Sequence, residues 1–132
     1  MPDHMPKAPE GELATRTFAM PRDVNVNGDI FGGWVMSQMD IAAYSIARTY
    51  TQSRLVTAAV NSMSFFLPIH VGDFVSCYGK VIAKGRTSMR VEISVWVAPG
   101  EGGDLRHVTS GVFVYVSVDE NGKPIPLPDF GF

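Results

Sequence analysis

Apolar and polar residues alternate along two stretches in the second half of the chain. In residues 88–97 the apolar residues share one face of an extended strand: Met89, Val91, Ile93, Val95 and Val97. In residues 105–119 a set of valines also falls on one face of an extended strand: Val108, Val112, Val114, Val116 and Val118. Because side chains point alternately to the two faces of a strand, both stretches are predicted to be β-strands.

Three further stretches are bounded by residues that interrupt regular structure. Residues 13–20 end before a proline, residues 55–66 end shortly before another, and residues 74–84 begin after a Gly-Asp pair. All three are predicted to be strands. Long strands joined by short connections favour an antiparallel sheet.

Residues 34–52 contain neither glycine nor proline and are predicted to form a helix. On a helical wheel its polar side chains gather in an arc of about 120°. They are Ser37, Gln38, Ser45, Arg48, Thr49 and Gln52. The order of strand, helix and four strands predicts an α+β fold in which the helix covers one face of the sheet.

The second face of the strand at 105–119 carries Thr109, Phe113 and Tyr115. This face is more apolar than a solvated face should be, and a single helix leaves it uncovered. We interpret it as a face that another copy of the chain covers, with scattered surface aromatics as the alternative.

Asp40 lies on the predicted helix about 60° outside the polar arc. Its neighbours three and four residues away are mainly apolar: Met36, Ser37, Ala43 and Tyr44. A carboxylate in such surroundings needs a partner or has a function. We consider a general base or nucleophile in a partly dry pocket, and as the alternative an aspartate satisfied by a hydroxyl such as that of Tyr44 or Ser37.

Gly32 and Gly33 directly precede the predicted helix. Glycine lets the backbone approach a ligand closely, and the free N–H groups at a helix N-terminus favour negative charge. A developing oxyanion would be stabilised there. Two glycines before a helix are also a common turn, but together with Asp40 they supply the two parts that an acyl hydrolase needs.

Composition excludes several classes of protein. The chain has 132 residues, 45% of them apolar, with 11 basic and 13 acidic side chains and a net charge of −2. This predicts one globular domain and argues against a nucleic-acid partner. A single cysteine, Cys77, fits a reducing compartment. His4, His70 and His107 are scattered along the sequence, so no metal site is predicted.

No stretch of the sequence reads as a membrane span or a signal peptide. Polar residues interrupt the longest apolar-leaning stretch, residues 30–47, and the first residues lack an apolar core. We therefore expect a cytoplasmic protein without a membrane partner. Residues 1–12 are expected to be a flexible lead-in, residues 13–123 the folded domain, and residues 124–132 a Pro-rich tail.

Residues 25–40 read Asn-Val-Asn-Gly-Asp-Ile-Phe-Gly-Gly-Trp-Val-Met-Ser-Gln-Met-Asp. This motif closely resembles the signature of the YciA-type acyl-CoA thioesterases of the hotdog-fold superfamily. The resemblance extends over roughly residues 13–122 and includes shorter motifs at 60–65, 68–69, 71–73, 78–79 and 85–88. It implies a hotdog fold, in which a curved antiparallel sheet wraps a long central helix.

The resemblance also implies roles for individual residues. Asp40 is expected to act as general base or nucleophile, Asn25 to orient water or substrate, and the backbone of Gly32, with Gly33 adjacent, to hold the oxyanion. Phe31 stands where many hotdog enzymes carry histidine, so catalysis should not depend on a histidine. The active site is expected to be shared: Asp40 of one subunit faces the Asn25–Gly33 loop of the other. The minimal unit is then a homodimer, and family members are commonly trimers of dimers.

Coenzyme A, as substrate moiety and product rather than cofactor, needs cations and amides for its phosphates. Residues that match the family's nucleotide-contacting segment offer both: Lys84, Gly85, Arg86, Thr87 and Ser88. Without the resemblance this segment reads as an ordinary polar hairpin. Arg90 is a second candidate. Asn61, Ser62 and Ser64 are candidates to line the pantetheine tunnel or else form the polar side of a strand.

Three other functions stay open at this point. A hotdog dehydratase or hydratase would pair a histidine with a carboxylate, and the histidines here lie far from the helix in sequence. A non-catalytic acyl-CoA-binding module would need the pocket without the base, and a purely structural oligomer leaves Asp40 unexplained.

Overall fold

The computed structural model describes residues 8–130, apart from the side chain of Ser62, and contains one long helix and five strands. The elements are β1 (Glu12–Phe18), a short 3-10 turn η1 (Pro21–Asp23), α1 (Gly32–Ala47), β2 (Arg54–Phe65), β3 (Phe74–Lys84), β4 (Ser88–Ala98) and β5 (Arg106–Val118). Of the lead-in predicted at 1–12, residues 1–7 lie outside the described residues, as do residues 131–132 of the tail.

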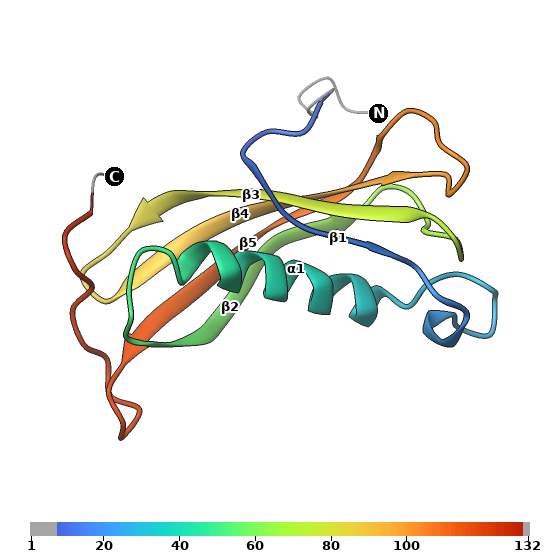
Figure 1. The fold of residues 1–132 in the computed structure, drawn as a ribbon. Helices are drawn as coiled ribbons and strands as arrows, with labels where there is room; N and C mark the ends of the chain where they lie inside the picture. The colour runs from blue at the N-terminus through green and yellow to red at the C-terminus, as the bar shows by residue number, and fades with distance from the viewer. Residues whose placement is uncertain (1–7, 131–132) are drawn as a thin grey trace.

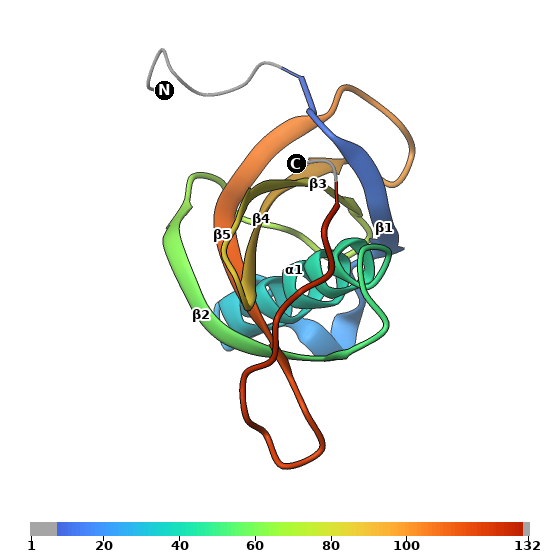
Figure 2. The ribbon, with the colours of Figure 1, turned by 90° about the vertical axis from the view of Figure 1, so that its left-hand side faces the viewer.

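The five strands form one antiparallel sheet in the order β1-β3-β4-β5-β2. The sheet curves around α1, with β1 and β2 at its opposite edges (Figures 1 and 2). The core lies between α1 and the concave face, where the helix contributes Val35, Met39, Ala42, Ala43, Ile46 and Ala47. This arrangement confirms the predicted α+β architecture of one helix against an antiparallel sheet.

Helix α1 ends at Ala47, five residues before the end predicted from the sequence. The backbone N–H groups of Thr49 and Tyr50 donate to the carbonyls of Ile46 and Ala47, both at 3.1 Å. The Thr49 hydroxyl also donates to the Ile46 carbonyl at 2.7 Å. These shorter-range bonds compete with continued α-helix, and the absence of glycine and proline left no sequence signal for the stop.

The two faces of β5 are the reverse of those assumed in the sequence interpretation. Thr109, Phe113 and Tyr115 are at most 1% exposed and face the helix rather than another copy. The strand register places Tyr115 beside Met89 and Phe113 beside Val91, which are also buried. The valines Val112, Val114 and Val116 therefore lie on the opposite, convex face. The predicted face assignment is wrong: this chain's own helix covers Phe113 and Tyr115, so these two residues give no evidence for or against self-association.

His107 is buried at the start of β5 on the convex side, only 3% exposed. Its ring stacks on Trp96 at 4.9 Å between ring centroids and lies 5.4 Å from Phe66. Nε2 lies 2.7 Å from the Ser110 hydroxyl, while Nδ1 has no hydrogen-bond partner among the described residues. Burial lowers the pKa of His107 below its usual value, and a bond to the Thr109 carbonyl opposes this shift only in part.

Acidification is therefore expected to destabilise the fold through His107. Its pKa is lower when folded than when unfolded, so below about pH 6.5 the unfolded chain binds a proton that the folded chain does not. The variant His107→Phe keeps an aromatic ring in the stack. Between pH 7.5 and 5.5 its Tm should fall less than the Tm of the wild type. Thermal unfolding at the two pH values measures this, with the exposed His70→Gln as control. Equal losses in wild type and His107→Phe would contradict the assignment.

Candidate active site

Asp40 lies on α1 where the helix contacts β2 and β5. Its Oδ1 accepts a hydrogen bond from the Tyr115 hydroxyl at 2.5 Å and another from the Thr57 hydroxyl at 3.0 Å. The Tyr115 hydroxyl also lies 2.9 Å from the Asp40 backbone carbonyl. Thr57 and Tyr115 are cross-strand neighbours in the β2–β5 register, so one position of the sheet supplies both donors.

These partners differ from those that the sequence suggested. The Ser37 hydroxyl donates to the Trp34 carbonyl at 2.7 Å, and the Tyr44 ring packs edge-on against Tyr115 at 6.0 Å. The sequence reasoning missed Tyr115 and Thr57 as site residues. Tyr115 is 75 positions from Asp40 and was placed on the wrong face of its strand, so its contact with the helix could not be foreseen.

The two oxygens of Asp40 have unequal surroundings. The hydroxyls of Thr57 and Tyr115 both donate to Oδ1, whereas Oδ2 lies 3.4 Å from the Thr57 hydroxyl, a longer contact. Burial raises the pKa of the Tyr115 phenol far above its usual range, and the bond to Asp40 raises it further. Tyr115 therefore stays protonated and donates. Oδ2 is the oxygen left with the capacity to accept a proton from water or to attack a carbonyl carbon.

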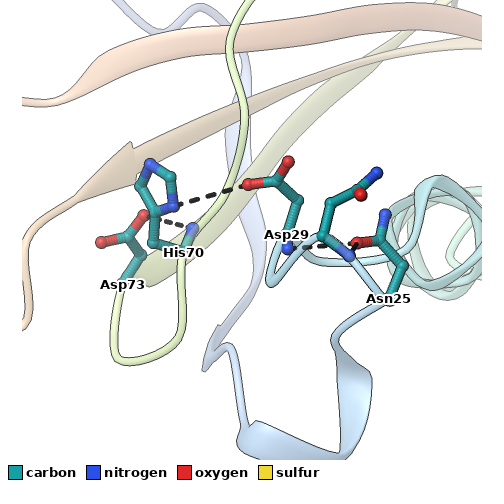
Figure 3. Close-up of polar contacts among 5 residues, drawn as sticks. Asn25, Asp29, His70 and Asp73 are labelled. Carbon is teal, nitrogen blue, oxygen red and sulfur yellow. Dashed lines mark hydrogen bonds and ion pairs between the residues drawn. The ribbon is translucent and has the colours of Figure 1, made fainter.

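Asn25 lies in the loop before α1, and its side chain closes that loop. Its Oδ1 accepts hydrogen bonds from the backbone N–H groups of Asn27 at 2.8 Å and Asp29 at 3.2 Å. Figure 3 shows the contact between Asn25 and Asp29. Because two N–H donors point at it, this atom is the amide oxygen rather than the nitrogen. The remaining end of the side chain is an NH₂ group, so Asn25 can offer donors to a ligand while its oxygen maintains the turn.

The loop is anchored to the segment between β2 and β3. The Ile30 N–H donates to the Ile69 carbonyl at 3.1 Å, and Asp29 Oδ1 lies 3.8 Å from His70 Nδ1. The His70 N–H in turn donates to Asp73 Oδ2 at 2.9 Å (Figure 3). Asp73 is itself buried. These contacts fix the loop that carries Asn25 relative to the first turn of α1.

Gly32 and Gly33 form the exposed first turn of α1, so the helix begins two residues earlier than predicted. Phe31 occupies the N-cap and makes no side-chain capping bond. Within residues 8–130, the N–H groups of Trp34 and Val35 donate to the Phe31 carbonyl, and no acceptor is found for those of Gly32 and Gly33. These two donors are available to an oxyanion at the positive end of the helix dipole.

Within one chain, Asp40 and Gly32 do not converge on a single point. They are eight residues apart on one helix, which corresponds to about 12 Å along its axis. A reacting carbonyl must lie about 3 Å from both the oxyanion donor and the base or its water. Within one chain, Asp40 and the Gly32 N–H are therefore too far apart along the helix to contact the same carbonyl group directly.

The candidate coenzyme A residues form the turn between β3 and β4. The Gly85 N–H donates to the Ser88 carbonyl, and the carbonyls of Arg86 and Thr87 accept from Leu127 and Ser117, all at 2.8 Å. The ammonium of Lys84 lies 5.2 Å from the centre of the Phe130 ring. The turn is thus fixed by β5 and the C-terminal segment, and it presents the exposed Arg86 to solvent.

The candidates on β2 do not lie beside Asp40. The register pairs Asn61 with Val112 and Ser64 with Ser110, on the face opposite to Phe113 and Tyr115. The side chain of Ser62 lies outside the described residues. No cluster of three or more His, Cys, Asp or Glu side chains suited to a metal occurs within residues 8–130. In the same residues, no helix has the length and apolarity to cross a bilayer.

Comparison with known proteins gives consistent matches over nearly the whole chain. The family described as Thioesterase superfamily matches residues 27–103. The acyl-CoA thioester hydrolase YciA of Salmonella typhimurium is 48% identical over 127 residues, which cover 94% of this chain and 96% of that protein. The hexameric thioesterase of Yersinia pestis is 49% identical, with a TM-score of 0.88 over 93% of this chain and 100% of that one. A hexameric hotdog fold thioesterase of Campylobacter jejuni is 40% identical, with a TM-score of 0.82 over 89% and 91%.

Proposed function

The chain belongs to the thioesterase superfamily, and from this membership we propose that it hydrolyses acyl-CoA to a free carboxylic acid and coenzyme A. Its fold is the hotdog fold that the sequence motif implied. The observation that carries the proposal is the carboxylate of Asp40, which two hydroxyls orient so that Oδ2 is left to react. Coenzyme A is then the carrier part of the substrate and a product, and the chain's own groups supply the chemistry.

The proposed reaction begins with the thioester carbonyl oxygen at the N–H of Gly32, with Gly33 adjacent. Asp40 Oδ2 takes a proton from water as the water oxygen attacks the carbonyl carbon. Negative charge develops on the carbonyl oxygen, where the helix N-terminus stabilises it. Collapse of the tetrahedral intermediate breaks the C–S bond, and the proton on Asp40 passes to the departing thiolate. Attack by Asp40 itself to form an anhydride is the alternative first step.

Asn25 would assist by donating from its NH₂ group to the substrate or to the attacking water, because its oxygen is committed to the loop. Lys84 and Arg86 would contact the phosphates of coenzyme A from the β3–β4 turn, with Gly85, Thr87 and Ser88 shaping and lining it. This placement rests on the family motif and on the two cations of the turn, of which Arg86 is exposed and Lys84 is half-buried.

The active unit is proposed to be a dimer in which Asp40 of one subunit serves the Gly32 end of the other. The separation of about 12 Å along α1 supports this arrangement. The hexameric state of the Yersinia and Campylobacter relatives supports assembly of three such dimers. The single cysteine, buried Cys77, supports a reducing compartment such as the cytoplasm.

A histidine-dependent dehydratase fits the site poorly. Within the described residues, His70 lies against Asp29 and His107 is enclosed by Trp96 and Phe66. Neither histidine contacts Asp40, whose partners are hydroxyls.

The proposed function is tested by release of free thiol from a panel of acyl-CoAs of increasing chain length. Purified wild-type protein should release thiol from at least one member of the panel with saturable kinetics. Absence of thiol release at every chain length would refute the hydrolase proposal.

Removing the Tyr115 hydroxyl is expected to slow hydrolysis without weakening substrate binding. Hydrogen bonds to charged groups contribute about 1.5–3 kcal/mol, so Tyr115→Phe should lower kcat roughly 10- to 100-fold. KM should change little, because Tyr115 acts through Asp40 and is enclosed in the core. Steady-state kinetics with one acyl-CoA measure both constants. Tyr78→Phe, which removes a strand hydroxyl bonded to Arg16, is the matched control. An equal fall in kcat for both variants would show that Tyr115 has only a structural role.

A further inference from the structure

A cavity of about 380 Å³ opens beside the first turn of α1. It lies between the N-terminal end of the helix and the segment that leaves β2. Every side chain that lines it is apolar; they include Val35, Phe65, Leu67, Ile69 and Val108. Of the residues that line this cavity, only Gly32 takes part in the proposed hydrolysis.

The cavity is continuous with the proposed oxyanion position. Gly32, whose N–H is the proposed donor, forms part of the cavity wall. The Phe65 ring stands beside it, with Cζ 3.7 Å from the point where a Cβ on Gly32 would lie. Phe65 also lines the cavity and is 49% exposed, so its ring lies at the rim next to the glycine. A group bonded to a carbonyl carbon held at Gly32 would pass this ring on entering the cavity.

We propose that this cavity holds the tail of the acyl chain and that Phe65 determines which chain lengths fit. The inference rests on the proposed thioesterase function and adds to it the chemical class of the group that is bound: an unbranched alkyl chain. The side chains that line the cavity are all apolar and none is charged, which suits methylene groups better than the phosphates of coenzyme A.

The volume sets an upper limit on the chain. A dry apolar cavity of about 150 Å³ holds benzene, which is about 25 Å³ per carbon, so 380 Å³ corresponds to roughly 15 carbons when completely filled. In the single chain the cavity is open on one side, and an acyl chain would fill it only in part. Affinity should therefore rise through medium-length chains and then level off.

The test uses binding of S-alkyl-CoA thioethers, which cannot be hydrolysed, to the assembled protein by titration calorimetry. Burial of each methylene group should improve affinity by up to about fourfold between S-butyl-CoA and S-decyl-CoA. Phe65→Trp, which enlarges the ring at the rim, should flatten this rise. Phe65→Ala should extend it to longer chains. Phe18→Ala removes a similarly exposed phenylalanine at the end of β1 that does not line the cavity, and it should leave the series unchanged.

Because no bond is broken, this result is independent of whether the protein hydrolyses thioesters. An affinity that does not depend on chain length in the wild type would overturn the proposal. So would a chain-length series that neither Phe65 variant alters while S-butyl-CoA still binds. Loss of S-butyl-CoA binding in Phe65→Trp alone would mark that variant as misfolded, and Phe65→Ala then decides the outcome.

Discussion

Replacing Asp40 by asparagine is expected to lower kcat for acyl-CoA hydrolysis at least ~10²-fold, the usual cost of losing a required base. Asparagine keeps an oxygen that can accept the hydrogen bonds of Tyr115 and Thr57. The position of Oδ2 then carries an NH₂ group, which cannot take a proton from water. Packing and orientation are preserved while the basic oxygen is removed, so KM and Tm should change little. Thiol release and thermal unfolding measure the two effects.

The matched control is Asp104→Asn, which makes the same change of charge in the exposed loop between β4 and β5. This variant should retain the wild-type rate. Full activity in Asp40→Asn would remove Asp40 from the mechanism but would leave the hydrolase function standing. A fall in Tm together with kcat would show instead that the carboxylate is needed for the fold.

The architecture followed from the sequence because its signals are local. Alternation in β4, the uninterrupted run that became α1, and the glycines and prolines between elements depend only on neighbouring residues. The face of β5 depends on which side of the sheet the helix covers, and both of its faces are apolar. The alternation therefore does not show whether the face with Phe113 or the face with the valines is buried against the helix. Only the contact between Tyr115 and α1 identifies the buried face.

Part of the site was predictable because Asp40 and Gly32 are also identified by local sequence signals. Asp40 stands out because a helix converts sequence spacing into direction, and Gly32 stands out because it begins that helix. The hydroxyls that orient Asp40 come from β2 and β5, whose register with the helix no local pattern encodes. Nothing in the sequence indicated that Asn25 Oδ1 accepts hydrogen bonds within its own loop. These bonds leave only the NH₂ group of Asn25 to contact a ligand, as a hydrogen-bond donor.

Removing the N–H of Gly32, at the start of α1, is expected to lower kcat by a similarly large factor. Gly32→Pro removes this donor, and proline is tolerated at the first position of a helix. Phe31 has φ −57° and ψ 135°, an extended conformation that suits a residue before proline. Loss of one oxyanion donor typically lowers kcat about 10²- to 10³-fold. Gly32→Ala keeps the N–H, and its Cβ would meet only the Phe65 ring at 3.7 Å, so it should stay active.

Two inactive variants are expected to restore activity when they share an oligomer. In a heterodimer of Asp40→Asn and Gly32→Pro subunits, one site combines both substitutions and the other combines an intact Asp40 with an intact Gly32. Random pairing after co-expression makes half of the dimers mixed, so activity should return to about a quarter of the wild-type value. The two variants purified separately and mixed without subunit exchange should remain inactive. Co-expressed oligomers that stay at the level of the single variants would contradict a site shared between subunits, which the separation of about 12 Å along α1 suggests.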